Sequence, residues 1–288
     1  MKLALGTVQF GLAYGVASTT GRVDAQTAAK ILSQARQAGI DTLDTAIAYG
    51  DSEKVLGKLG VSSWKVISKL PEMPENCHDV SNWVYEQLKA SLLRLGVSRL
   101  YGLLLHRPAQ LLQPNGQILY RALAQAKTDG LVDKIGISIY SPDELGLLFD
   151  RFGFDLVQSP LNILDRRLID SGWADRLKLT GVEVHTRSVF LQGLLLMPAN
   201  QRPVTFQRWP DVWAEWEGWL SKTGLSPLQA CLRYINTIAS VDRVVVGVDS
   251  ADQLEQILAD VNGELPSLPS FAALNDQRLI NPASWNQL

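Results

Sequence analysis

The sequence has 288 residues, with 27 Lys and Arg against 29 Asp and Glu, and 46% of its residues are hydrophobic. The near-neutral balance excludes a broad basic surface, so nucleic-acid binding is not the expected task. Two cysteines, Cys77 and Cys231, cannot form a disulfide framework, which indicates a reducing cytoplasm. No apolar run reaches the roughly 18 residues of a membrane helix, and the N-terminal apolar run is too short for a signal peptide. Neither membrane insertion nor secretion is expected.

Apolar, β-branched runs recur along the chain with helical patterns between them. Several of these runs are apolar on both faces, as buried parallel strands are. The predicted strands are Leu3–Thr7, Thr42–Thr45, Lys65–Lys69, Gly102–His106, Lys134–Ile139, Leu156–Ser159, Gly181–Thr186 and Arg243–Val248.

Helix-capping residues punctuate the segments between the strands. Asp24 can cap one helix, with Gly39 just past its end, and Ser226 followed by Pro opens another. Asp249 or Ser250 can cap a further helix after the last strand.

Strand alternating with helix eight times predicts a (β/α)8 TIM barrel, which takes about 250 residues. A doubly wound sheet is the alternative, but its G-x-G-x-x-G fingerprint is missing after the first strand. We expect one domain over residues 1–288, with residues 264–288 as an irregular tail.

Ionisable side chains follow three consecutive strands, at the barrel end where active sites form. They are Asp44 with Tyr49 just beyond it, then Lys69, then His106. Taken singly, each has an ordinary structural explanation, such as a snorkelling lysine or a packed tyrosine with a hydrated hydroxyl. Together they form a coherent acid site.

In this set the carboxylate can hold the lysine charged, and the ammonium beside Tyr49 is expected to lower the pKa of its phenol from about 10. His106 adds a second donor where a carbonyl oxygen would sit. A proton donor beside an electrostatic cradle for a developing alkoxide is what carbonyl reduction requires.

These residues also carry a family resemblance. The segments 44–50 (DTAIAYG), 68–69 (SK) and 104–108 (LLHRP) resemble the aldo-keto reductase family in order and spacing, and the resemblance covers nearly the whole chain. It implies a (β/α)8 barrel that binds a nicotinamide dinucleotide without a Rossmann fold. It also implies NAD(P)H-dependent reduction of a small aldehyde or ketone, and a monomer.

The resemblance assigns roles to individual positions. Tyr49 would be the general acid, Lys69 paired with Asp44 would tune it, and His106 would orient the substrate carbonyl. The implied cofactor-binding positions are Gly6, Thr7, Asp44, Ser138, Gln158, Arg187, Gly193, Gly247, Asp249, Ser250 and Gln253.

Several positions depart from the family pattern. Ile139 replaces a usual Asn, and Arg187 stands where an aromatic ring often stacks on the nicotinamide, although a guanidinium can also stack. Asp249 follows the eighth strand, where a partner of the 2′-phosphate is usual, and it would favour free ribose hydroxyls if it is not simply a helix cap. NADP(H) is the family expectation, and NAD(H) is not excluded.

The family's N-terminal hairpin plug is also short or absent, since only Met1 and Lys2 precede the first strand. The bottom of the barrel must then be closed otherwise, and the C-terminal tail is one candidate. The altered cofactor positions leave an alternative function: a barrel of this family with a binding or regulatory role and little catalytic activity.

Two further features invite a functional interpretation that the pattern does not favour. Trp209, Trp213, Trp216 and Trp219 share one helical face, which predicts core packing rather than an aromatic wall over the substrate. The pair Cys77-His78 has no second pair at ligand spacing, so no metal site is expected.

Overall fold

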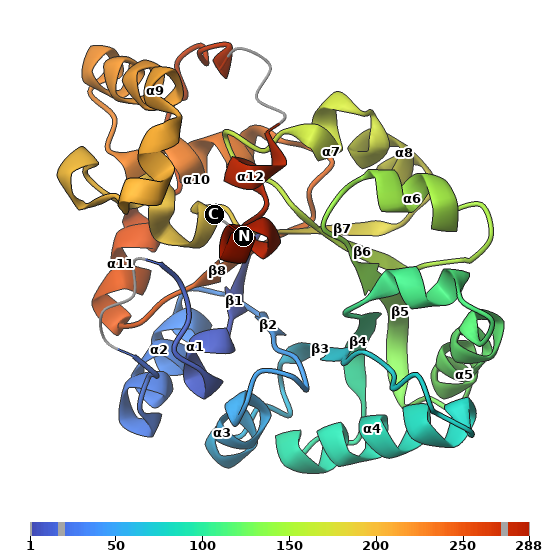
Figure 1. Cartoon of the computed structure of the whole chain (residues 1–288). Helices are drawn as coiled ribbons and strands as arrows, with labels where there is room; N and C mark the ends of the chain where they lie inside the picture. The colour runs from blue at the N-terminus through green and yellow to red at the C-terminus, as the bar shows by residue number, and fades with distance from the viewer. Residues whose placement is uncertain (1, 17–20, 272–275, 288) are drawn as a thin grey trace.

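The eight predicted strands close into a parallel barrel. The computed structural model describes residues 2–16, 21–271 and 276–287. The strands are β1 (Leu3–Gly6), β2 (Thr42–Asp44), β3 (Lys65–Leu70), β4 (Leu100–Leu105), β5 (Val132–Ser138), β6 (Leu156–Pro160), β7 (Glu183–Arg187) and β8 (Arg243–Gly247). Each pairs with its sequence neighbour, and β1 also pairs with β8, which closes the ring (Figure 1).

Helices surround this ring and supply the outer layer of a (β/α)8 barrel (Figure 1). They are α1 (Val8–Gly11), α2 (Ala25–Gln37), α3 (Ser52–Leu59), α4 (Val80–Leu95), α5 (Gly116–Thr128), α6 (Asp143–Leu148), α7 (Arg167–Asp170), α8 (Trp173–Leu179), α9 (Pro210–Thr223), α10 (Pro227–Thr237), α11 (Ala251–Asp260) and α12 (Gln277–Ile280). In these described ranges, no helix is both long and apolar enough to cross a membrane.

The predicted helix caps form. The Asp24 carboxylate accepts from the backbone of residues 26 and 27, and Ser226 with Gln229 makes a reciprocal capping box. Such caps satisfy backbone donors that have no partner inside the helix.

The barrel interior has an apolar middle and polar ends. Ile67, Leu104 and Leu156 form a buried cluster inside the ring, whereas the larger core lies between strands and helices. At the N-terminal end, Glu183 accepts hydrogen bonds from Lys134 and from Tyr101, the latter at 2.8 Å. A buried polar layer of this kind must be internally satisfied.

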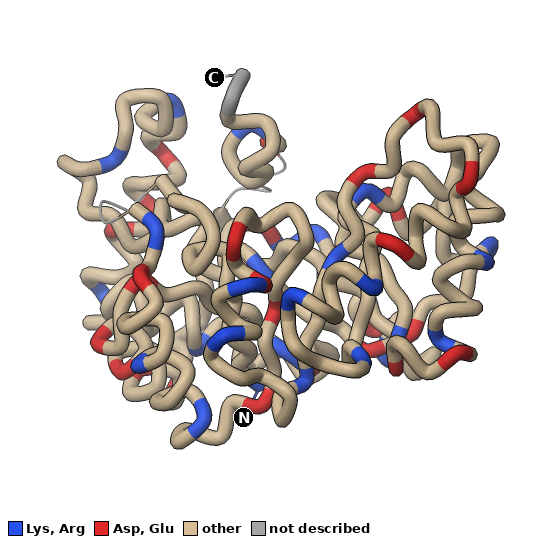
Figure 2. Tube along the Cα trace, turned by 90° about the horizontal axis from the view of Figure 1, so that it is seen from below, with Lys and Arg blue, Asp and Glu red and all other residues tan. Residues whose placement is uncertain are grey.

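The C-terminal tail lies at the opposite end of the barrel from the N-terminus (Figure 2). In the described chain, Lys2 directly precedes β1. The expectation that the tail closes the barrel bottom is wrong, because Glu183 and its partners fill that end. The described tail residues instead form α12 and a 3-10 turn at residues 282–287.

The tryptophan stripe packs as a core face. Trp213, Trp216 and Trp219 of α9 are buried, and Trp209 directly precedes the helix and does not line the cavity described below. The tail packs against this face, since Trp209 Nε1 donates to the Asp276 carboxylate at 3.1 Å.

Candidate active site

The ends of β2 and β3 hold a buried carboxylate–ammonium pair. Lys69 Nζ donates to Asp44 Oδ1 at 2.7 Å and to the Thr45 carbonyl at 2.9 Å, with the Lys69 side chain 0% exposed and that of Asp44 5% exposed. Burial lowers the pKa of Lys69, and the attraction of Asp44 acts against it. Gln158 Nε2 donates to the second Asp44 oxygen at 2.7 Å, so the carboxylate is held from both sides.

Tyr49 and His106 lie above this pair. Their rings meet edge to face with centroids 5.8 Å apart, and Lys69 Nζ lies 5.2 Å from the Tyr49 ring centroid. Burial raises the pKa of Tyr49 above its ordinary value, and the Asp44 charge adds to the effect. The expectation of a lowered pKa is therefore wrong, because desolvation of the phenolate dominates, and the cation that acts against this rise is Arg187.

His106 is neutral in this environment. Burial lowers its pKa to about 3, and the nearby charges of Lys69 and Arg187 act in the same direction. A neutral imidazole can still donate one hydrogen bond to a carbonyl oxygen.

Helix α1 fixes the backbone of the Tyr49 loop. Gly11 lies so close to this loop that a Cβ on it would be 1.8 Å from the Tyr49 carbonyl oxygen and 2.6 Å from the Ser52 nitrogen. The Ser52 hydroxyl in turn donates to the Thr7 carbonyl at 2.8 Å. The segment 7–11, which directly follows β1, therefore constrains where the Tyr49 loop lies.

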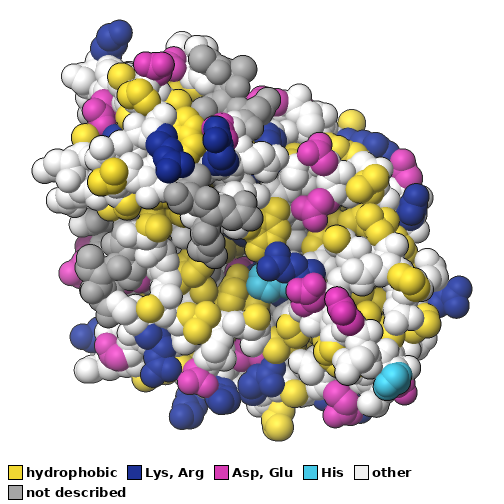
Figure 3. Space-filling model, viewed as in Figure 1, with side chains coloured by type: hydrophobic (Ala, Val, Ile, Leu, Met, Phe, Trp, Pro, Cys, Tyr) yellow, Lys and Arg dark blue, Asp and Glu magenta, His cyan; other side chains and the backbone are white. Residues whose placement is uncertain are grey.

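A large cavity opens at the carboxyl ends of the strands, with a volume of about 660 Å³. Figure 3 shows hydrophobic side chains together with Lys, Arg and His around the central hollow of this face. The predicted site residues that line it are Gly6, Thr7, Asp44, Tyr49, His106, Arg187, Gly193, Gly247, Asp249 and Gln253. The structure thus brings residues from five strands and their loops to one surface.

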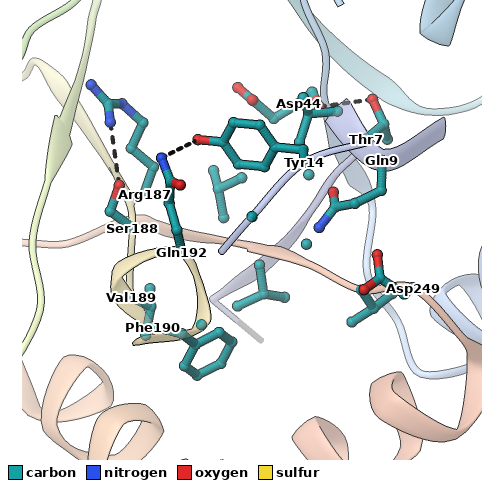
Figure 4. Close-up of a pocket in the computed structure, with 18 of the residues that line it drawn as sticks. Thr7, Gln9, Tyr14, Asp44, Arg187, Ser188, Val189, Phe190, Gln192 and Asp249 are labelled. Carbon is teal, nitrogen blue, oxygen red and sulfur yellow. Dashed lines mark hydrogen bonds between the residues drawn. The ribbon is translucent and has the colours of Figure 1, made fainter. Parts of the chain in front are cut away.

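Four predicted site residues lie outside the cavity lining. Lys69 is beneath Asp44, and Gln158 bridges Asp44 to Ser138, whose hydroxyl donates to Gln158 Oε1 at 3.2 Å. Ser250 instead caps α11, where its Oγ accepts from the Gln253 backbone at 3.2 Å. Ser250 rather than Asp249 is the cap, and Asp249 faces the cavity (Figure 4).

Sequence reasoning missed the residues that cover the cavity. Tyr14, from the loop after β1, accepts a hydrogen bond at 3.2 Å from Gln192 in the loop after β7 (Figure 4). Pro282 and Ala283 of the tail also line the cavity. These loops have no periodicity; the Tyr14 and Gln192 side chains offered no motif from which the contact could be predicted.

Arg187 is held firmly at the cavity wall. Its Nη2 donates to the Ile139 carbonyl at 3.0 Å, and its Nη1 donates to the Ser188 hydroxyl at 3.3 Å. The guanidinium carbon lies 4.7 Å from the centroid of the Tyr140 ring, within cation–π range. Tyr140 is a further cavity residue that sequence reasoning missed.

The structure therefore combines a (β/α)8 barrel with a large cavity at the carboxyl ends of its strands, where barrel enzymes carry their active sites. Within the described ranges, no three His, Cys, Asp or Glu side chains gather as metal ligands.

Comparisons with known proteins agree with this architecture. A family model described as "Aldo/keto reductase family" matches residues 2–268. Two curated relatives, each named "Aldo-keto reductase", come from Mycobacterium sp. strains JLS and KMS and are 31% and 30% identical over 132 residues. The chain matches only 45% of the length of each relative, and the match covers 43% of the chain itself.

Solved structures share the fold at lower sequence identity. An aldo-keto reductase from Bacillus halodurans in its holo form has a TM-score of 0.72 at 22% identity, covering 99% of this chain and 94% of that one. A glycerol dehydrogenase from Gluconobacter oxydans has a TM-score of 0.69 at 21% identity, covering 98% and 93%. Because the family model matches residues 2–268, the chain belongs to the aldo/keto reductase family.

Proposed function

We propose that this chain is an NAD(P)H-dependent oxidoreductase that reduces a small aldehyde or ketone to an alcohol. The observation that carries the proposal is the buried Asp44–Lys69 pair directly below Tyr49, with His106 beside that ring. A phenol with a raised pKa stays protonated and can give its proton to an alkoxide as the alkoxide forms.

Each residue has a defined task in this reaction. The bound cofactor supplies the hydride. Tyr49 protonates the carbonyl oxygen, the neutral His106 orients that oxygen by a hydrogen bond, and the Asp44–Lys69 pair keeps a fixed dipole below the phenol. Because these groups are buried before the substrate arrives, little reorganisation is needed.

The cavity suits a dinucleotide. It reaches from Tyr49 to Asp249 and Gln253 near the N-terminus of α11, which attracts anions. The buried Oε1 of Gln9 has no hydrogen-bond partner within the described chain, so a bound polar group would satisfy it.

We assign six further implied positions to the cofactor: Gly6, Thr7 and Gly247 beside the ring, Gly193 in the covering loop, and Ser138 and Gln158 toward its carboxamide. NADP(H) is the cofactor that the family supports, and Asp249 keeps NAD(H) in competition because its charge opposes a 2′-phosphate.

The decisive test is NADPH- and NADH-dependent reduction of para-nitrobenzaldehyde by wild type and Tyr49→Phe. Loss of the proton donor should lower kcat by roughly two to four orders of magnitude, while cofactor binding, followed by tryptophan fluorescence, persists. Tyr85→Phe is the matched control, because that hydroxyl bonds to Asp129 on the outer helices and should leave kcat unchanged.

Two outcomes would contradict the proposal. Undiminished turnover by Tyr49→Phe would mean that another group is the acid. Saturable cofactor binding without turnover of any carbonyl compound would favour the binding or regulatory alternative, which the altered positions Ile139 and Arg187 support.

We further expect a monomer in a reducing cytoplasm. The two cysteines are unpaired, and Cys231 is buried, which is consistent with such a compartment.

A further inference from the structure

Arg187 contributes a cation to the cavity in which the carbonyl group would react. Among the described residues that line this cavity, it is the single lysine or arginine. Its charge helps to lower the pKa of His106 and opposes the rise in the pKa of Tyr49, so its field reaches both groups that would contact the carbonyl oxygen.

No side chain among the described residues neutralises the charge of Arg187. Within the described chain, no carboxylate lies at ion-pair distance from its guanidinium, whose two protein hydrogen bonds go to the Ile139 carbonyl and the Ser188 hydroxyl. A guanidinium carries five N–H donors, so donors remain for a ligand.

The other charged groups of the site do not compensate the positive charge of Arg187. Asp44 and Lys69 form an ion pair whose charges sum to zero, and His106 is neutral. The other cavity carboxylate, Asp249, lies on the far side of the drawn pocket from Arg187 (Figure 4). Summed over the described residues, the reacting end of the cavity therefore has a net positive charge of one unit.

The guanidinium is also preorganised. Contact with the Tyr140 ring and two hydrogen bonds fix its plane, so little side-chain entropy is lost when a ligand binds. A fixed, planar guanidinium is the protein group best matched to a carboxylate, which it can bind through two parallel hydrogen bonds.

We infer that Arg187 binds the carboxylate of the substrate, and that the substrate class is therefore an aldehyde or ketone that also carries a carboxylate group. This inference rests on the proposed function. In this arrangement Tyr49 and His106 take the carbonyl oxygen while Arg187 takes the acid group, so one substrate is held at two points.

The test compares carbonyl acids with their neutral methyl esters. We would measure kcat/KM for phenylglyoxylate and for para-carboxybenzaldehyde, each beside its methyl ester. Wild type should prefer at least one acid over its ester by roughly tenfold or more, as expected for a charge-assisted hydrogen-bonded pair. In Arg187→Gln this acid-to-ester ratio should fall to about one, whatever happens to the absolute rates.

Arg107→Gln is the matched control. Arg107 also lies over the Tyr140 ring, at 5.5 Å, but its side chain is half exposed and it does not line the cavity. Arg107→Gln should preserve the acid-to-ester ratio. This control separates direct binding of the carboxylate by Arg187 from a general effect of removing one positive charge.

Equal kcat/KM for both acids and their esters in wild type would overturn the inference, as would an unchanged ratio in Arg187→Gln. If no carbonyl compound is turned over, the proposed function fails, and binding decides the inference separately. Benzoate should then raise the Tm of wild type above that with benzamide, and the difference should vanish in Arg187→Gln. No benzoate effect would reject carboxylate binding.

Discussion

Tyr49 and His106 receive opposite pKa shifts from the same burial. Desolvation disfavours the charged form of each, so the phenol resists losing a proton and the imidazole resists gaining one. Both side chains consequently stay neutral across the ordinary pH range, which suits a reduction in which Tyr49 donates and His106 orients.

We predict that kcat/KM for carbonyl reduction has no inflection near pH 6.5, the ordinary pKa of histidine, because the pKa of His106 is about 3. Alcohol oxidation requires the phenolate of Tyr49, so its rate should rise with pH and not level off below pH 10. Rate profiles in both directions check this prediction.

The prediction would be contradicted by an inflection near pH 6.5 in wild type that disappears in His106→Gln. His78→Gln serves as the control, because His78 is exposed outside the cavity.

Asp249→Ser should shift cofactor preference toward NADPH. Removing a carboxylate close to a 2′-phosphate relieves repulsion of order 1 kcal/mol, so the ratio of NADH to NADPH dissociation constants should rise roughly fivefold to tenfold. Fluorescence titration with both cofactors measures this ratio.

Asp252→Ser changes the same charge in the first turn of α11, outside the cavity lining, and should leave the ratio nearly constant. If both variants shift the ratio of dissociation constants equally, the effect comes from the overall loss of negative charge and not from the position of Asp249.

At the scale of elements, α1 fixes the Tyr49 loop through a contact that only glycine permits. In Gly11→Ala the new methyl group would overlap the Tyr49 carbonyl oxygen, so the loop must move. We predict a fall in kcat of about 100-fold, since displacement of a catalytic group by about 1 Å has an effect of that order. Steady-state kinetics with para-nitrobenzaldehyde measure it.

Gly146→Ala is the paired control. Gly146 lies in α6, where an added methyl group would meet no atom within 4 Å, so the variant should gain slightly in stability without loss of kcat. Full activity in Gly11→Ala would show that the Tyr49 loop tolerates displacement.

The elements themselves were largely predictable, because strand periodicity and helix caps are local properties. All eight predicted strands are confirmed, with ends that differ by no more than two residues. The covering loops were not predictable. Ser188, Leu191 and Gln192 adopt positive φ angles of 62°, 48° and 54°, which tertiary contacts such as Tyr14–Gln192 must stabilise.

The candidate site residues likewise divide into those that could be predicted from the sequence and those that could not. Asp44, Tyr49, Lys69 and His106 were predictable because strand ends of a barrel converge on one face. Tyr140 was not, since its role depends on an arginine that follows it by more than forty residues. The wrong direction for the pKa of Tyr49 has a similar origin, because residue types do not reveal the extent of burial.

Across the whole molecule, the barrel divides into a reactive end and a stabilising end. At the latter, Glu183 bonds to Lys134, Tyr101 and His185, the last at 3.0 Å. Burial alone would raise the pKa of Glu183, but hydrogen bonds from His185 and Lys134 outweigh it and hold the pKa well below its usual 4.5.

Glu183→Gln should destabilise the fold by about 2 kcal/mol at neutral pH, because it leaves buried partners without their counter-charge. Since the folded-state pKa of Glu183 is depressed, its contribution is present above pH 4.5 and is lost as the pH falls further. Urea unfolding at pH 7 and pH 3.5 should show the difference between wild type and variant shrinking at the lower pH.

Glu86→Gln, at an exposed position of α4, should change stability little at either pH. A constant difference between wild type and Glu183→Gln at both pH values would contradict the role of the Glu183 charge.

The position of the tail has a practical consequence for handling the protein. Pro282 and Ala283 border the cavity, whereas Lys2 lies at the other end of the barrel. An affinity tag or fluorescent fusion joined to the tail just beyond Pro282 and Ala283 would begin close to the opening through which ligands pass. The same attachment ahead of β1 would emerge with the length of the barrel between it and that opening, so assays are best performed on N-terminally tagged protein.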